Sequence, residues 1–243
     1  MTAFDELIPH PGAGRAFQQT VVAGLADCAP SGRVRLDALA RWLQDAALDD
    51  VVDAGMGEVA LWVVRRSRIR VARFPRFGET ATVRTWSSGV GRMWAQRRTS
   101  VTTEAGGAVE AVALWVHLDP ASWRPFPITP AEMEVYGPSA AGREVKARLR
   151  HPGPPPDGSR SPWTFRATEL DVADHINNAA YWSPLEEELL AGGEEPDAID
   201  VEVEHKTPAQ PGEHAVVAEG ERRWIVDDAS GEVRASFALD RLN

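Results

Sequence analysis

The sequence predicts an α+β protein made of two similar units, each with one helix and an antiparallel sheet. Three observations lead to this prediction. Apolar residues recur at helical spacing from residue 36, the segments that follow alternate with a period of two, and the second half presents the same order in fewer residues. A helix followed by a run of strands is typical of α+β folds rather than of parallel α/β folds.

The helix of the first unit is predicted over residues 36–55, LDALARWLQDAALDDVVDAG. Its apolar positions share one face, and they are Leu36, Leu39, Trp42, Leu43, Ala46 and Ala47. Gly55 is the expected end, because glycine readily adopts the left-handed conformation that closes a helix.

Four strands are expected after this helix. Residues 61–74 alternate Arg66, Arg68 and Arg70 with Ser67, Ile69 and Val71, which is the period of a strand. PRFGE at 75–79 is a turn, EAGG at 104–107 is a hairpin connection, and the remaining strands lie at 80–86, 93–104 and 108–119.

The second unit presents these elements again. A polar turn at 169–178 precedes the segment AAYWSPLEEELL at 179–190, and a strand follows at 198–206. Segments 214–227 and 232–242, joined by DASG, correspond to the last hairpin of the first unit.

Proline and glycine separate the two units. HPGPPPDGSRSP at 151–162 resists both helix and sheet and predicts a linker. We therefore expect units at 1–128 and 161–243, with a connecting segment at 129–160 that begins with a short helix. Packing the two sheets edge to edge, or around both helices, would enlarge a core that is marginal in either unit alone.

Composition narrows the classes of function. A formal net charge of −10 argues against non-specific nucleic-acid binding, which needs a basic surface. The single cysteine, Cys28, cannot form an internal disulfide, and the acidic, proline-broken N-terminus does not resemble a signal peptide, so a cytoplasmic protein is expected. No apolar run reaches the ~20 residues of a membrane span. Without metal-ligand spacing, a P-loop, a dinucleotide fingerprint or a GxSxG elbow, we expect no metal and no cofactor.

Three stretches in order resemble the plant and bacterial acyl-ACP thioesterases. They are RLDALARWLQDAALDDVVDAG, WVVRRSRIRVARFPRFGETATVRTW and LDVADHINNAAYW, and the resemblance extends from about Phe17 to Leu239. It implies a tandem (double) hotdog fold, in which an antiparallel sheet wraps each long helix. It also implies hydrolysis of the thioester between a fatty acyl chain and acyl carrier protein.

The resemblance also implies a site in the second unit. The family pattern D-x-N-x-H-x-x-N matches Asp171, His175 and Asn178, but Ala173 replaces its asparagine. A further acidic residue of the family falls near Lys206, with Glu204 as the neighbouring alternative. APSGRVRL of the first unit aligns with DVADHINN and places Ala29 opposite Asp171 and Arg33 opposite His175, so we expect one site per chain.

The chemistry assigns roles to these residues. Asp171 is expected to activate water as a general base, with direct nucleophilic attack as the variant, and His175 to orient the water or polarise the thioester. Losing one positioning donor at Ala173 can lower the rate by about 10²–10³, so we expect a slow enzyme or a replacement group. A structural histidine and a polar turn remain the alternatives for this segment.

The oxyanion is expected at free backbone N–H groups where the second helix begins. Local rules start that helix at Ser183 as N-cap, with Pro184 first and Glu186 completing a capping box. The resemblance starts it near Asn178, and we favour a helix from Asn178 that is kinked at Pro184. Asn177 is expected to cap it or to contact substrate.

Substrate contacts are assigned to large side chains. Trp62, Trp86, Trp115, Tyr181 and Trp182 are candidates for lining an acyl tunnel, with ordinary core packing as the alternative. Arg66, Arg68 and Arg70 would share a strand face that meets the acidic carrier protein, unless that face is solvated or paired internally.

Two other functions compete with acyl-ACP hydrolysis. One is an acyl or carrier-protein binding protein without turnover, as Ala173 and Lys206 suggest. The other is a hotdog enzyme that acts on acyl-CoA or as a dehydratase. The chain is expected as a monomer or a homodimer.

Overall fold

Ten strands form one sheet in the computed structural model, which describes residues 7–56, 61–119, 121–193 and 195–242. The strands are β1 (Phe17–Val22), β2 (Leu61–Arg73), β3 (Thr80–Val90), β4 (Trp94–Thr103), β5 (Ala108–Leu118), β6 (Ser159–Phe165), β7 (Ile199–His205), β8 (Gly212–Glu219), β9 (Arg222–Asp227) and β10 (Val233–Arg241). The α-helices are α1 (Leu36–Asp53), α2 (Pro130–Ala140) and α3 (Ser183–Ala191), with 3-10 turns at Leu25–Asp27, Ala167–Glu169 and Ala180–Trp182.

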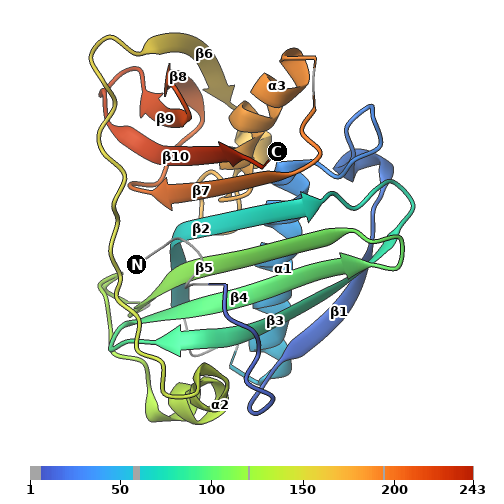
Figure 1. The fold of residues 1–243 in the computed structure, drawn as a ribbon. Coiled ribbons are helices and arrows are strands. Elements are labelled where there is room, and N and C mark those ends of the chain that lie inside the picture. The colour runs from blue at the N-terminus through green and yellow to red at the C-terminus, as the bar shows by residue number, and fades with distance from the viewer. Residues whose placement is uncertain (1–6, 57–60, 120, 194, 243) are drawn as a thin grey trace.

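The strand order confirms the internal duplication. It runs β1-β3-β4-β5-β2-β7-β10-β9-β8-β6, so the second five strands are the first five in reverse. The two units meet edge to edge at the antiparallel pair β2 and β7, where Ile69 faces Val201 (Figure 1). This junction pairs two strand edges that each unit alone would expose.

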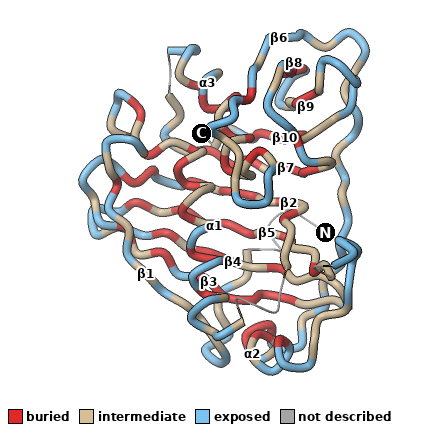
Figure 2. The backbone as a smooth tube through the Cα atoms, turned by 180° about the vertical axis from the view of Figure 1, so that it is seen from behind, coloured by how far each residue is buried: buried red, intermediate tan, exposed pale blue. Residues whose placement is uncertain are grey.

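One core serves both units. The long helix α1 lies against one face of the sheet, behind the strands in Figure 1. Leu39 and Trp42 of α1 belong to the same buried cluster as Ile69 of β2, Phe237 of β10 and Leu189 of α3. Figure 2 shows buried positions, in red, in both units. The predicted helix at 36–55 is confirmed, since α1 ends at Asp53 and Gly55 takes the left-handed conformation.

The second helix differs from both predictions of its start. Residues 180–182 form a 3-10 turn that runs into α3 at Ser183. Ser183 has helical backbone angles (φ −61°, ψ −41°), so it is not an N-cap. The Asn177 side chain occupies that role instead, because its Oδ1 accepts from the N–H of Ala179 at 2.9 Å. Helical backbone therefore starts after Asn178 and tightens before Pro184 rather than kinking at it.

Several strands depart from the sequence expectations. Segment 214–227 is a hairpin, because Gly220 (φ 54°) makes the turn between β8 and β9. The edge strands β1 and β6 were not predicted, and β6 begins within the proline-rich stretch at 151–162. Pro162 fits there because an edge strand needs ladder hydrogen bonds on one side only. The short helix expected after residue 127 is α2.

The arginines of β2 do not form an exposed basic face, which corrects that expectation. Arg66 and Arg68 are buried, and Arg68 makes a bidentate ion pair with Asp200 of β7 at 2.7 and 2.5 Å. Arg66 lies 3.8 Å from Glu202, and Arg70 faces Asp200 in the strand register. The alternative prediction for these arginines, internal ion pairing, is therefore the arrangement found.

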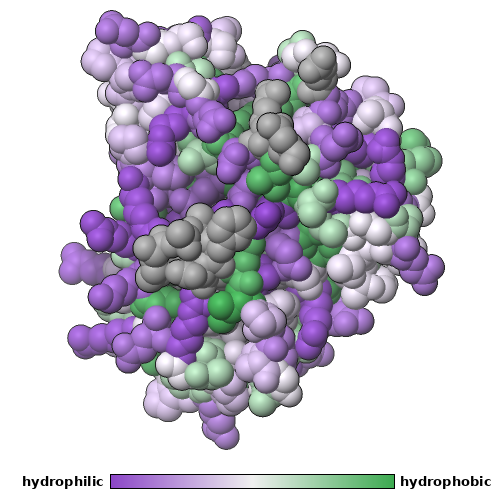
Figure 3. Space-filling model, in the orientation of Figure 1, coloured by the Kyte–Doolittle hydropathy of each residue, from purple (hydrophilic) through white to green (hydrophobic). Residues whose placement is uncertain are grey.

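The face of the molecule seen in Figure 3 is largely hydrophilic, with apolar side chains gathered near its centre.

No helix in the described parts of the chain is long and apolar enough to cross a membrane.

Candidate active site

The turn before α3 repeats the turn before α1 in its backbone. Asp171 N–H donates to the carbonyl of His175 at 2.9 Å, and Ala29 N–H donates to that of Arg33 at 2.8 Å. Gly32 has φ 86°, and Asp174 at the equivalent position has φ 59°, a conformation that aspartate tolerates better than most residues. The alignment of 29–36 with 171–178 is therefore confirmed, and the two copies differ in their side chains.

Asp171 is held by two hydrogen bonds in this turn. Its Oδ1 accepts from the backbone N–H of Ala173 at 2.9 Å, and its Oδ2 from Nδ2 of Asn177 at 3.3 Å. Because Asn177 also caps the helical turn through Ala179, the carboxylate and the helix start form one hydrogen-bonded unit. Substituting alanine for the family asparagine removes a side chain at 173 but keeps this backbone donor.

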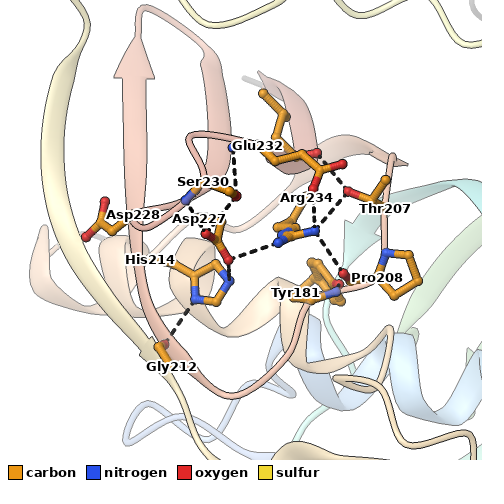
Figure 4. A network of polar contacts seen from close by, with 12 residues as sticks. Tyr181, Thr207, Pro208, Gly212, His214, Asp227, Asp228, Ser230, Glu232 and Arg234 are labelled. Atoms are coloured by element: carbon orange, nitrogen blue, oxygen red, sulfur yellow. Dashed lines mark hydrogen bonds and ion pairs between the residues drawn. The ribbon is translucent and has the colours of Figure 1, made fainter.

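A second layer supports the turn from behind. Ile176 N–H donates to the carbonyl of Ala209, and Gln210 Nε2 donates to that of Asp174 at 2.8 Å. Arg234 fixes this supporting loop by donating to Thr207 Oγ1 and the Pro208 carbonyl while it pairs with Asp227 at 2.9 Å (Figure 4). The arginine holds the pKa of Asp227 well below its usual range, with help from Ser230.

Asp171 and Asn178 line a cavity of about 340 Å³ between α1, α2 and the sheet. Trp62 of β2 and Trp115 of β5 contribute to its largely apolar wall, together with Gln44 of α1. A smaller cavity of about 40 Å³ adjoins it, because both share Gln44, Ala47, Arg97, Trp115 and Asn178. Such an apolar space with few polar groups is typical of a small-molecule site.

His175 is absent from the described residues that line either cavity. Its imidazole lies edge-on to the ring of Trp123, with centroids 6.5 Å apart. The carbonyl of His175, rather than its ring, contacts Asp171. The predicted trio is therefore brought together only in part, with Asp171 and Asn178 at the cavity and the histidine ring beside it.

The aromatic candidates divide between cavity and core. Trp62 and Trp115 line the larger cavity and Trp182 the smaller one, whereas Trp86 belongs to neither wall and has Arg84 and Arg98 over its ring. Tyr181 is buried against Phe165, and its hydroxyl accepts from the N–H of Ala209 at 2.7 Å. Burial raises the pKa of Tyr181 to about 12.

The acidic position predicted on β7 faces away from the cavities. Glu204 accepts from the backbone N–H groups of Arg150 and His151 and from Lys206 Nζ at 2.7 Å. His205, between them, lines the smaller cavity, because neighbouring residues of a strand point to opposite faces. Burial, with a smaller contribution from Arg65, lowers the pKa of His205 to about 3, so the ring is neutral.

One polar cluster could hold a metal ion among the described residues. His151, Glu202 and Glu204 bring ligand atoms within 4.8 Å of one another on the outer face of β7. Glu204 already pairs with Lys206, and Glu202 contacts His151 at 3.2 Å. The cluster is thus an ion-pair network, and its three residues are absent from the described lining of both cavities.

An ion pair that the sequence patterns did not reveal joins Arg97 of the cavity wall to the buried Asp50. Arg97 of β4 donates to Asp50 of α1 at 2.6 Å, and Arg15 binds the other carboxylate oxygen at 2.6 Å. The guanidinium of Arg97 also lies over the ring of Tyr136. No local motif predicts these contacts, because they join residues 35 and 47 positions apart.

Comparisons with known proteins agree with this architecture. Over 93% of this chain, the fold matches the 12:0-ACP thioesterase from Umbellularia californica (TM-score 0.73, 18% identity, 96% of that chain). It also matches an acyl-ACP thioesterase from Bacteroides thetaiotaomicron over 93% of this chain (TM-score 0.72, 17% identity, 98% of that chain). The double hotdog fold is therefore confirmed.

Sequence relatives point the same way. An uncharacterized protein of Mycobacterium tuberculosis is 25% identical over 243 residues, covering 97% of this chain and 96% of its own length. The chloroplastic acyl-(acyl-carrier-protein) hydrolase FATB2 of Cuphea viscosissima is 22% identical over 197 residues, which is 69% of this chain and 46% of that protein. Residues 14–136, half of the chain, match the acyl-ACP thioesterase N-terminal domain. The chain belongs to the acyl-ACP thioesterase family.

Proposed function

We propose that this protein hydrolyses the thioester of a fatty acyl group carried by acyl carrier protein, with Asp171 as the general base. The observation that carries the proposal is the position of Asp171 on an apolar cavity large enough for an acyl chain. Family membership supports thioester hydrolysis in general. The named substrates of the structural relatives, a 12:0-ACP among them, support acyl-ACP as the form of the substrate.

The hydrolysis needs a water beside Asp171. The carboxylate takes a proton from this water as its oxygen attacks the thioester carbonyl carbon, which gives a tetrahedral oxyanion. When the oxyanion collapses, the C–S bond breaks and the sulfur leaves as a thiolate. Asp171 returns the proton that it took from water, which gives a free fatty acid and the carrier thiol. The two hydrogen bonds to Asp171 fix its orientation, so the base is positioned before substrate arrives.

The backbone N–H of Asn178 is the donor that we assign to the oxyanion. It stands at the start of the helical turn and makes no hydrogen bond to the described part of the chain, while those of Ala179 and Ala180 are taken by Asn177. A helix start favours negative charge. We assign His175 to the turn through its carbonyl and not to the reacting atoms.

We assign the larger cavity, of about 340 Å³, to the acyl chain. Trp62 and Trp115 limit its extension. Asn177 acts through Asp171, and Trp182 contributes to the adjoining wall.

A second candidate is a non-hydrolysing acyl-ACP binding protein. The observation that favours it is the absence of His175 from the described residues that line the cavities, together with Ala173 in the family motif. Such a protein would use the same cavity and the same carrier but would release no fatty acid.

Turnover of a substrate panel separates these functions. Purified protein is incubated with acyl-ACPs of short, medium and long saturated chains and with the matching acyl-CoAs, while free thiol and fatty acid are measured. Asp171→Asn keeps the size of the side chain and one of its two acceptors but removes the base, so we expect kcat to fall by about 10²–10⁴. Tight acyl-ACP binding without turnover by the wild type would favour the binding protein, and full activity of the Asn variant would exclude Asp171 as the base.

A further inference from the structure

The duplication produces two equivalent contacts, each between the helix of one unit and the turn of the other. Glu186 lies eight residues after Asn178, and Gln44 lies eight residues after Leu36. Because Leu36 and Asn178 occupy the same place in the repeated turn, Gln44 of α1 is the counterpart of Glu186 of α3. The edge-to-edge junction puts each helix beside the turn of the other unit.

The first of these contacts is occupied by an anion. Oε2 of Glu186 accepts from the backbone N–H of Leu36 at 3.0 Å, and Oε1 lies 2.6 Å from Nη2 of Arg33. The side chains of both Glu186 and Arg33 are almost fully buried. The structure thus contains an oxygen anion bound to the N–H at the start of α1, supplied by its own chain.

The second contact is open. Gln44 and Asn178 line both cavities, from α1 and from the turn of the second unit. The backbone N–H of Asn178 makes no hydrogen bond to the described part of the chain. The side-chain amide of Gln44 makes none there either. A carboxylate oxygen occupies this position at the turn of the first unit, whereas the equivalent position at the turn of the second unit lies beside the neutral side-chain amide of Gln44 and the cavities.

We propose that Gln44 is a catalytic residue, whose Nε2 donates to the thioester oxygen beside the N–H of Asn178. This inference rests on the proposed function. As water adds to the carbonyl carbon, the thioester oxygen gains a negative charge like the one that the Glu186 carboxylate carries at the turn of the first unit. Two donors from different units then stabilise it, while an amide adds no charge that would repel it.

The neutrality of Gln44 gives a sharp test. Gln44→Glu gives α1 the carboxylate that Glu186 provides on α3, and this carboxylate would accept from the Asn178 N–H and fill the oxyanion position. Gln44→Ala removes the donor only. With acyl-ACP as substrate, we expect kcat to fall by about 10²–10³ in the alanine variant and further in the glutamate variant, with KM changed little in the alanine variant. Gln18→Glu, on the exposed edge strand β1, is the matched control for added charge and should retain wild-type kcat.

Amide exchange of Asn178, followed by NMR, gives a readout that does not depend on turnover. We expect slower exchange in Gln44→Glu than in wild type, as a new hydrogen bond forms, and unchanged exchange in Gln18→Glu. Wild-type kcat in Gln44→Ala, or unaltered Asn178 exchange in Gln44→Glu, would overturn the inference while leaving Asp171 as the base. A wild-type protein that hydrolyses no thioester would overturn both proposals.

Discussion

Nδ2 of Asn177 donates to Oδ2 of Asp171 at 3.3 Å, while Oδ1 of the same side chain accepts from the N–H of Ala179 at 2.9 Å. One amide therefore ties the proposed base to the start of the helical turn. The first unit has Arg35 at this place, with its own contacts to Asp37 and the Cys28 carbonyl. This link between carboxylate and helix needs both the N–H donor and the C=O acceptor of a side-chain amide, which Asn177 has and Arg35 does not.

The first prediction concerns the two functions of Asn177, which are to orient Asp171 and to cap the helical turn. Asn177→Ser keeps an oxygen that can cap the helical turn but loses the amide that orients Asp171. We expect kcat to fall by about 10–100-fold, since small displacements of a catalytic group have effects of this size, with a melting temperature close to wild type. Asn177→Ala should lower both. Equal kcat in wild type and Asn177→Ser would show that Asp171 does not need this donor.

The buried pair between Glu186 and Arg33 predicts a large effect on stability. Glu186→Ala leaves the Arg33 guanidinium and the Leu36 N–H in the interior without this partner, so we expect the free energy of unfolding to fall by about 3–5 kcal/mol. Glu188→Ala is the matched control on the same helix, because Glu188 pairs with Arg223 at the surface and should contribute less than about 1 kcal/mol. Urea unfolding of both variants measures the difference, and similar losses would contradict the assignment.

The ion pair between Arg68 and Asp200 predicts a structural role for the β2 arginines. Arg68→Ala leaves Asp200 buried beside an empty space, and we expect a loss of about 3–5 kcal/mol in stability. The double variant Arg68→Met, Asp200→Leu replaces both charges and should be much closer to wild type. If instead KM for acyl-ACP rises in both variants while KM for acyl-CoA is unchanged, Arg68 contacts the carrier protein.

His205 predicts a pH dependence of stability. Its pKa is about 3 in the folded protein because of burial and Arg65, against an ordinary value near 6.5. Between these values the unfolded chain binds a proton that the folded chain does not, so the free energy of unfolding falls as the pH falls from 6.5. The slope contributed by one such group is at most about 1.4 kcal/mol per pH unit. Urea unfolding between pH 7 and pH 4.5 should give a shallower pH dependence for His205→Leu, and parallel curves would refute the assignment.

The local patterns of the sequence predicted much of the fold. Helix α1 and strands β2 to β5 follow from spacing that any short segment carries in itself. The edge strands β1 and β6 have weaker patterns, and proline in β6 favours a loop until the partner β8 is known. The capping box that Ser183 and Glu186 match locally does not form, because Ser183 is already helical and Glu186 accepts from Leu36 of the first unit instead.

The candidate site was predicted only in part for a related reason. Asp171 and Asn178 could be identified because the family motif that they match lies within one short turn of the sequence. The direction of the His175 ring depends on Trp123, which comes from a distant loop. Arg66 and Arg68 are buried because β7 pairs with β2 and brings acidic residues beside them. The alternating pattern of β2 alone does not show which strand will lie next to it or which acidic residues that strand carries.

The sequence by itself determined that this protein consists of two copies of one helix-and-sheet plan, and that only the second copy carries Asp171 in its turn. Those properties are local in the chain or repeated along it. Only the tertiary structure decided which helix faces which turn. Joining β2 to β7 brings Gln44 beside Asn178 and Glu186 against Leu36, across separations of more than a hundred residues that no local pattern spans.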